Sequence, residues 1–287
     1  MSKARLRQAQ PDANFNNMTR ALHLLKIDLK KMTSYRTFWV ICGLYFITLG
    51  VGAASGMEFL KWLASFIEGF GEEININRIP LYHFPDVWTN LIWCGGLLKI
   101  ILAIMVVISI TNEYQYRTVR QNIIDGLSRW EFLFSKMLTN VLLSLMSVAM
   151  IFVIGLVTGL IYTPEVQWDY VFTDLEFFPA YFLEIFAFLS YALMLGVLIQ
   201  RSGLTIVVLM LSHMLEAIIK ANVDNFAEWP LDFFPMQSIT NLVPLPFARY
   251  ALQEIQDYVA WQAVAIALVW IFLFNYFGYL KLKKADI

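Results

Sequence analysis

Four ionisable side chains lie within long apolar stretches of the chain, and they are the first residues that could carry chemistry. They are Lys99, Glu184, His213 and Glu216. Because an ionised side chain is costly in hydrocarbon, each is by default a functional candidate. Lys99 and Glu184 could form an ion pair that locks two helices together, or they could face a cavity and contact a polar group of a substrate. Glu184 and Glu216 are also near enough to the ends of their stretches to reach lipid headgroups.

Two acids and a histidine could also hold a metal ion, as in an intramembrane protease. His213 and Glu216 are three residues apart, however, whereas a helical pair of ligands favours a spacing of four, and Glu184 lies on another stretch. No H-E-x-x-H, C-x-x-C or G-x-S-x-G spacing occurs. We therefore predict no catalytic residue and no metal site, and an intramembrane metalloprotease is the less favoured alternative.

The second candidate is the charged segment from Asn112 to Lys136, which separates two apolar stretches. Ile123, Ile124 and Leu127 could form a small contact surface there. The charges could fix the orientation of a partner, because charge complementarity sets specificity more than affinity. The alternative is a solvated loop that only records membrane orientation. The residues assigned to docking are Glu113, Arg117, Thr118, Arg120, Ile123, Ile124, Asp125, Leu127, Ser128, Arg129 and Lys136.

Membrane-spanning helices are the elements that must position these residues. Hydrophobic residues make up 59% of the 287 residues and charged residues 15%, whereas soluble proteins carry about 25% charged residues. A helix of about 20 apolar residues can cross a bilayer. Six stretches pass this test: Phe38–Met57, Leu91–Thr111, Met137–Tyr162, Ala180–Ile199, Leu204–Ile219 and Tyr258–Leu280. We predict an all-α integral membrane protein with six transmembrane helices, of which the fifth is the shortest.

Lysine and arginine are distributed unevenly between the two sides that this topology defines. Sixteen of the 21 basic residues fall before the first stretch, between the second and third, after the fourth, or at the C-terminus. Because basic residues accumulate in cytoplasmic loops, both termini are predicted to be cytoplasmic. The N-terminal stretch lacks the apolar core of a cleavable signal peptide. We therefore expect a multi-pass protein of the cell membrane, surrounded by membrane lipid.

The N-terminal region is expected to have two parts before the six-span domain, which covers residues 38–287. Residues 1–18 are polar and are predicted to be a disordered cytoplasmic tail. Residues 19–37 carry an apolar stripe at helical spacing, which predicts an amphipathic helix lying flat on the inner leaflet. The alternative is a cytoplasmic extension of the first span.

The segment between the fifth and sixth stretches is rich in proline and aromatic residues. A solvated loop would not need so many aromatic rings, and irregular backbone at membrane depth survives only where protein or water satisfies it. We expect two short re-entrant helices flanking the turn from Pro244 to Pro246. An ordinary folded outer loop is the alternative.

This order of elements resembles the type-2 ATP-binding-cassette (ABC) permeases, and the charged segment carries the likeness most specifically. In that family an acidic residue precedes a Gly-Thr pair, an Arg, and then Ser-Arg and a Lys that opens the next span. The matching residues here are Glu113, Thr118, Arg120, Ser128, Arg129 and Lys136. Arg117 stands where Gly is usual, and Gly126 and Leu127 stand where a Pro often precedes the Ser.

The resemblance implies the permease subunit of an ATP-driven ABC exporter. The charged segment would be its coupling helix, docked on one of two ATPase subunits that bind ATP and Mg. Twelve spans would come from two permease chains, identical or related. The chain contains no G-x-x-x-x-G-K-[ST] phosphate loop, so we expect it to bind no cofactor, to hydrolyse no ATP itself and to have no nucleic-acid partner. A non-transporting scaffold that recruits an ATPase to a cell-envelope machine is the alternative.

Overall fold

The computed structural model describes residues 17–68, 81–165, 167–223, 233–247 and 258–284, and within these ranges it is helical and contains no strand. Six helical segments are long and apolar enough to cross a membrane, as in a multi-pass membrane protein. These spans one to six are Arg36–Gly56, Asp86–Gln115, Arg129–Tyr162, Phe177–Ile199, Ser202–Asn222 and Trp261–Lys284. They confirm the number and order of the predicted spans. The predicted tail lies outside the described residues up to residue 16.

Span two begins at Asp86 and not at the predicted Leu91, and it consists of two helices, α3 (Asp86–Leu97) and α4 (Lys99–Gln115). The early polar residues of α3 are tolerated because they find partners. The indole of Trp88 donates to the Val171 carbonyl at 2.9 Å, and the Asn90 amide donates to the Leu81 carbonyl at 2.8 Å. Composition alone could not include these residues in a span.

The junction of α3 and α4 lies at Leu98, whose N–H bonds to the Gly95 carbonyl at 3.0 Å. This bond spans three residues, so the turn is tighter than in an α-helix, and such turns inside helices often mark a hinge or a strained site. Lys99 is the first residue of α4. The one ionisable residue of the predicted second stretch therefore sits directly at the irregular turn.

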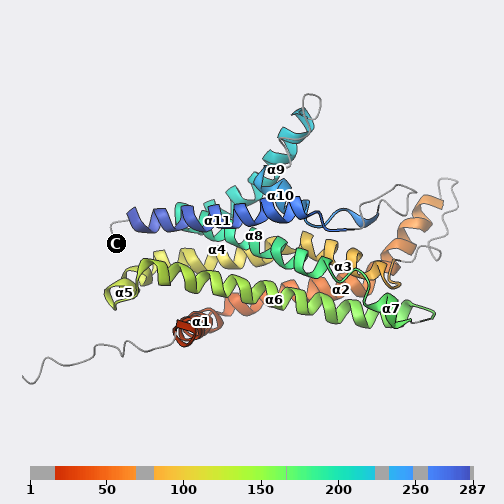
Figure 1. Cartoon of the computed structure of the whole chain (residues 1–287), viewed down its shortest axis with the longest axis horizontal. Helices are drawn as coiled ribbons and strands as arrows, with labels where there is room; N and C mark the ends of the chain where they lie inside the picture. The colour runs from red at the N-terminus through yellow and green to blue at the C-terminus, as the bar shows by residue number, and fades with distance from the viewer. Residues whose placement is uncertain (1–16, 69–80, 166, 224–232, 248–257, 285–287) are drawn as a thin grey trace, which may run out of the picture.

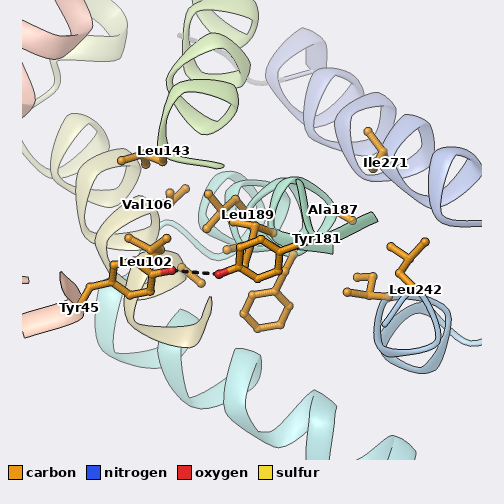
Figure 2. Close-up of a cluster of buried hydrophobic side chains, with 14 of the residues drawn as sticks. Tyr45, Leu102, Val106, Leu143, Tyr181, Ala187, Leu189, Leu242 and Ile271 are labelled. Carbon is orange, nitrogen blue, oxygen red and sulfur yellow. Dashed lines mark hydrogen bonds between the residues drawn. The ribbon is translucent and has the colours of Figure 1, made fainter. Parts of the chain in front are cut away.

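The centre of the bundle is α8 (Phe177–Ile199), which packs against α4, α6 (Arg129–Tyr162), α9 (Ser202–Val223) and α11 (Trp261–Lys284). In the most apolar 18-residue stretch of span four, 61% of the residues are buried, compared with 11% in the corresponding stretch of span five. Figure 1 shows the reason, because α9 leaves the bundle at a steep angle. Figure 2 shows side chains of α8 in the core, where Ala187 and Leu189 lie among residues of the neighbouring helices.

A separate helix, α1 (Asn17–Ser34), precedes α2 (Arg36–Glu68). Figure 1 views α1 nearly end-on while α2 runs along the bundle, so α1 does not simply extend the first span. Asp28 and Met32 point into the protein, whereas Lys26 and Lys30 are exposed. The inward face of α1 thus packs on protein, chiefly on α6.

Two short helices lie in the connections between spans. Helix α7 (Trp168–Val171) precedes span four, and α10 (Pro235–Thr240) lies between spans five and six. A turn at Asn241 and Leu242 follows α10, and Pro244 and Pro246 come after it. One short helix therefore precedes the predicted proline turn, and the segment after it, 248–257, lies outside the described residues.

Candidate functional site

The charged segment predicted to act as a coupling helix contains a short helix, α5 (Thr118–Ile124), which lies between spans two and three. Two residues with positive φ reverse the chain on either side of it: Arg117 at 56° and Gly126 at 98°. Glycine adopts such a conformation without strain, whereas for Arg117 it is uncommon. The chain then enters α6 through a capping box, in which the Ser128 hydroxyl accepts from the Glu131 N–H and the Glu131 carboxylate accepts from the Ser128 N–H. We call residues 116–128 the connector.

One face of the connector is anchored in the protein and the other is exposed. Val119 is buried, and Ile123 and Leu127 pack partly against the core. Ile124 is 69% exposed although it is apolar. Around it lie the exposed residues Tyr116, Arg117, Arg120, Gln121 and Asp125. A short helix therefore presents an exposed apolar side chain together with exposed charged and polar residues of the same segment, as protein contact surfaces do.

Glu113 and Lys136 lie inside the protein and offer no docking surface. The Lys136 ammonium donates to one carboxylate oxygen of Glu113 and, at 2.8 Å, to Oδ1 of Asp28. The Ser135 hydroxyl donates to Asp28 Oδ2 at 2.8 Å. All three charged residues are at least nine-tenths buried. We call Asp28, Glu113 and Lys136 the charge cluster.

The charge cluster joins three helices at the end of the bundle where the connector lies. Asp28 comes from α1, Glu113 from α4 and Lys136 from α6. The connector itself is attached nearby, since the Thr118 hydroxyl donates to the Glu113 carbonyl at 3.2 Å and Lys31 donates to Asn122 at 3.3 Å. A displacement of the connector would therefore act on α1 and on two spans at once.

The Lys99–Glu184 ion pair suggested by the sequence is present. The Lys99 ammonium lies 2.7 Å from Glu184 Oε1, and both side chains are buried. A Cβ placed on Gly96 would lie 2.8 Å from Glu184 Oε1, so only glycine lets α3 approach α8 this closely. We call Lys99 and Glu184 the mid-bundle pair. It fixes the irregular turn of span two against the central helix.

Three buried hydroxyl groups lie on the neighbouring helices and were not predicted as a site. Tyr45 of α2 and Tyr181 of α8 lie 3.2 Å apart through their hydroxyl oxygens, as drawn in Figure 2. The Ser147 hydroxyl of α6 is hydrogen-bonded to both, at 2.7 Å from that of Tyr181. The side chains are tyrosine and serine in otherwise apolar helices, so no periodicity marked them. They join three spans without any charge.

His213 and Glu216 are not brought to the mid-bundle pair. His213 is exposed on α9. The Glu216 carboxylate accepts from the backbone N–H groups of Met236 and Gln237, at 2.9 and 3.1 Å, in the first turn of α10. In the described part of the chain no group of three His, Cys, Asp or Glu side chains could hold a metal ion. Glu216 thus caps a short helix, a role that its sequence position did not reveal.

Comparison with known families places this geometry in context. The model of a family described as a protein of unknown function (DUF2705) matches residues 65–287. The chain belongs to the DUF2705 family. The region shared with DUF2705 contains the connector, the mid-bundle pair, Glu113 and Lys136, whereas Asp28 and Tyr45 precede it. No curated protein matches the chain, so DUF2705 membership assigns no activity.

Proposed function

We propose that this chain is the permease subunit of an ATP-driven exporter, coupled through its connector to separate ATPase subunits. The observation that carries this proposal is the two-faced geometry of the connector. Its inner face is fixed by Val119, and its outer face exposes Ile124 among Arg117, Arg120 and Asp125. A loop that only records orientation has no need of a rigid helix with an exposed apolar side chain.

The charge distribution supports a cytoplasmic position for the connector. Sixteen of the 21 basic residues fall on the side that holds the connector and both termini, as expected for cytoplasmic segments. The guanidinium of Arg129 donates to the Lys283 carbonyl at 3.0 Å, so the start of α6 and the end of α11 share this end of the bundle. An ATPase in the cytoplasm would meet the connector here.

Coupling follows from what the connector is attached to. The connector lies between Glu113, near the end of span two, and Lys136, near the start of span three. Asp28 joins α1 to both residues. When the ATPases close, force on α5 would be carried by this buried network to α1, α4 and α6. Such coupling requires two discrete arrangements of the helices that contact the ATPase differently.

The assembly proposed for transport contains two permease chains and two ATPase subunits, which bind ATP and Mg. The second permease chain is identical or related, because six spans are half of the twelve that the resemblance implies. Spans one and five suit the outside of a single bundle. Only 22% and 11% of the residues in their most apolar 18-residue stretches are buried within the chain. Lipid and a second permease chain would cover the rest.

The test reverses two exposed charges of the connector, Arg120→Glu with Asp125→Arg. We expect the variant to fold and to lose co-purification with its ATPase, together with transport-coupled ATP hydrolysis. The matched control is Arg201→Glu, an exposed charge outside the connector, which should keep both. If the double variant assembles and its coupled ATP hydrolysis is unchanged, the proposal is wrong. Recruitment without export of any cargo would instead indicate the scaffold.

A further inference from the structure

Two cavities of similar size lie side by side against α3. One, of about 560 Å³, is bordered by α2, α3 and Ile151 of α6. The other, of about 600 Å³, is bordered by Trp93 of α3, by α10 with its following turn, and by the start of α11. Both volumes fall in the range of about 300–1,000 Å³ that is usual for small-molecule sites.

The first cavity is lined almost entirely by hydrocarbon. Its walls include Leu49 and Ala53 of α2, Leu91 of α3, and Leu98 at the junction of α3 and α4. Gly52 opens the wall further, because a Cβ built there would meet no atom within 4 Å. Among the described residues, no charged side chain lines it. This apolar cavity lies between two spans. A hydrocarbon chain that enters it from the bilayer stays in an apolar environment throughout.

The second cavity offers hydrogen-bonding groups without charge. Ser238, Thr240, Asn241 and Gln262 line it together with Trp93 and with apolar residues such as Val243 and Ile266, and no charged residue of the described part of the chain does. An unpaired charge buried here would find no counter-ion among these described residues, and burying such a charge is costly. This polar cavity therefore suits hydroxyl and amide groups and disfavours phosphate, carboxylate or ammonium groups.

Two aromatic rings stand between the cavities. Trp93 lines the polar cavity and Phe247 lines the apolar cavity. Their ring centroids are 5.2 Å apart, and the rings meet edge to face at 85°. A molecule that occupies both cavities must therefore pass this pair, with its apolar part on the side of Phe247 and its polar part on the side of Trp93.

We propose that the two cavities together bind amphiphilic cargo, with a hydrocarbon chain in the apolar cavity and an uncharged hydroxyl- or amide-bearing head in the polar cavity. This inference rests on the proposed function, because it assigns the cavities to the exported molecule. It adds the substrate class. The contrast between the two linings selects amphiphiles over purely apolar or purely polar molecules, and the absence of charge among the described lining residues selects the head.

The test uses the purified full-length chain in phosphatidylcholine nanodiscs and a dodecyl glucoside that carries a photoactivatable diazirine in its chain. We expect labelled peptides from α2 and α3 around Gly52 and Leu91. Gly52→Trp should fill the apolar cavity and lower labelling there by about tenfold, because the chain loses its contacts. The matched control is Gly43→Trp on the same helix, where an added Cβ also meets open space but lines neither of the two cavities; its labelling should be unchanged.

The head is tested with the same photoactivatable chain carrying a sulfonate or an ammonium group. Both should label the cavity about tenfold less than the glucoside, because their charge would be buried unpaired. Equal labelling by all three heads, or equal labelling of the Gly52→Trp and Gly43→Trp variants, would overturn the proposal. Labelling spread evenly over the lipid-facing helices would do so too.

A second arm separates this inference from the proposed function. With the ATPase subunits present, ATP-dependent export of the glucoside should fall in Gly52→Trp while ATPase recruitment stays intact. If the isolated chain binds the glucoside as expected but recruits no ATPase, the proposed function fails and the binding site remains. If ATPase is recruited and export of the glucoside is the same in both glycine variants, the assignment of these cavities to cargo fails.

Discussion

The charge cluster and the mid-bundle pair are both buried ionic contacts, yet they are built differently. In the charge cluster one ammonium group serves two carboxylates, and one oxygen of Glu113 is buried with no hydrogen-bond partner, as is one oxygen of Glu184 in the mid-bundle pair. In the mid-bundle pair one ammonium serves one carboxylate. The cluster joins α1, α4 and α6 beside the connector, whereas the pair joins α4 to α8 in the interior.

The difference separates two mechanical tasks that the same chemistry can perform. The mid-bundle pair is balanced in charge and attaches the irregular turn of span two to the most buried helix, so it suits a fixed point. The charge cluster holds an excess of negative charge where the chain meets the proposed motor. One lysine shared by two acids allows two arrangements, because Lys136 can favour Asp28 or Glu113. The charge cluster therefore suits a moving joint.

The largest effect is expected at the charge cluster. Lys136→Met leaves two buried carboxylates without a counter-ion, and we expect the free energy of unfolding to fall by about 5 kcal/mol. Unfolding in mixed micelles titrated with SDS measures this. Adding Asp28→Asn and Glu113→Gln to the lysine variant should restore most of the loss. If Lys136→Met alone unfolds like the parent, the cluster does not hold the three helices together.

A smaller effect is expected at the mid-bundle pair. Lys99→Met leaves only one carboxylate unpaired, so we expect a loss of about 3 kcal/mol in the same titration. The exchanged variant, Lys99→Glu with Glu184→Lys, should fold because the pair is retained in reverse. Normal assembly and export by the exchanged variant would exclude a direct contact between these residues and the cargo. Failure of export with normal assembly would instead favour such a contact.

The close approach of α3 and α8 is tested at Gly96. A methyl group there would meet Glu184, so Gly96→Ala should disturb the mid-bundle pair and lower the free energy of unfolding by about 1–3 kcal/mol. Gly50→Ala on α2 is the control, because its Cβ would meet nothing within 4 Å. Equal stability of the two variants would show that the pair can shift to accommodate the methyl group.

The smallest effect is expected at Glu216. Its carboxylate accepts hydrogen bonds from uncharged backbone N–H groups, so it can be compared with both ionic contacts. Glu216→Ala removes the acceptor for Met236 and Gln237, and loss of a helix cap typically costs about 1 kcal/mol. Hydrogen exchange at these two amides should become faster while exchange in α8 is unchanged. Unchanged protection of the amides would mean that α10 does not depend on this carboxylate.

The six spans could be predicted because apolar length is a strong signal that survives without tertiary information. A helix in the connector was also anticipated, and the Lys99–Glu184 pair was one of two alternatives, because opposite charges within the second and fourth apolar stretches can satisfy each other. The start of span two was placed too late at Leu91. The residues before it are partly polar, and only the folded structure supplies the carbonyl groups of Val171 and Leu81 that satisfy them.

The contents of the charge cluster could not be foreseen in full. Glu113 and Lys136 were assigned to a docking surface because they match the acidic residue and the lysine of the permease motif. Asp28 was missed, although an acid within the apolar stripe of a lysine-rich helix is a signal in retrospect. The hydroxyl groups of Tyr45, Ser147 and Tyr181 carried no signal at all, since their meeting depends on how three spans pack.

The sequence separation within each ionic contact has a consequence for biogenesis. Glu113 and Lys136 are 23 residues apart, so they can meet as soon as the hairpin of spans two and three leaves the ribosome. Lys99 must wait for Glu184, 85 residues later. At about 5–20 residues per second this delay is roughly 4–17 s, during which an ammonium group in hydrocarbon has no counter-ion. The insertion machinery therefore has to shelter span two until span four is made.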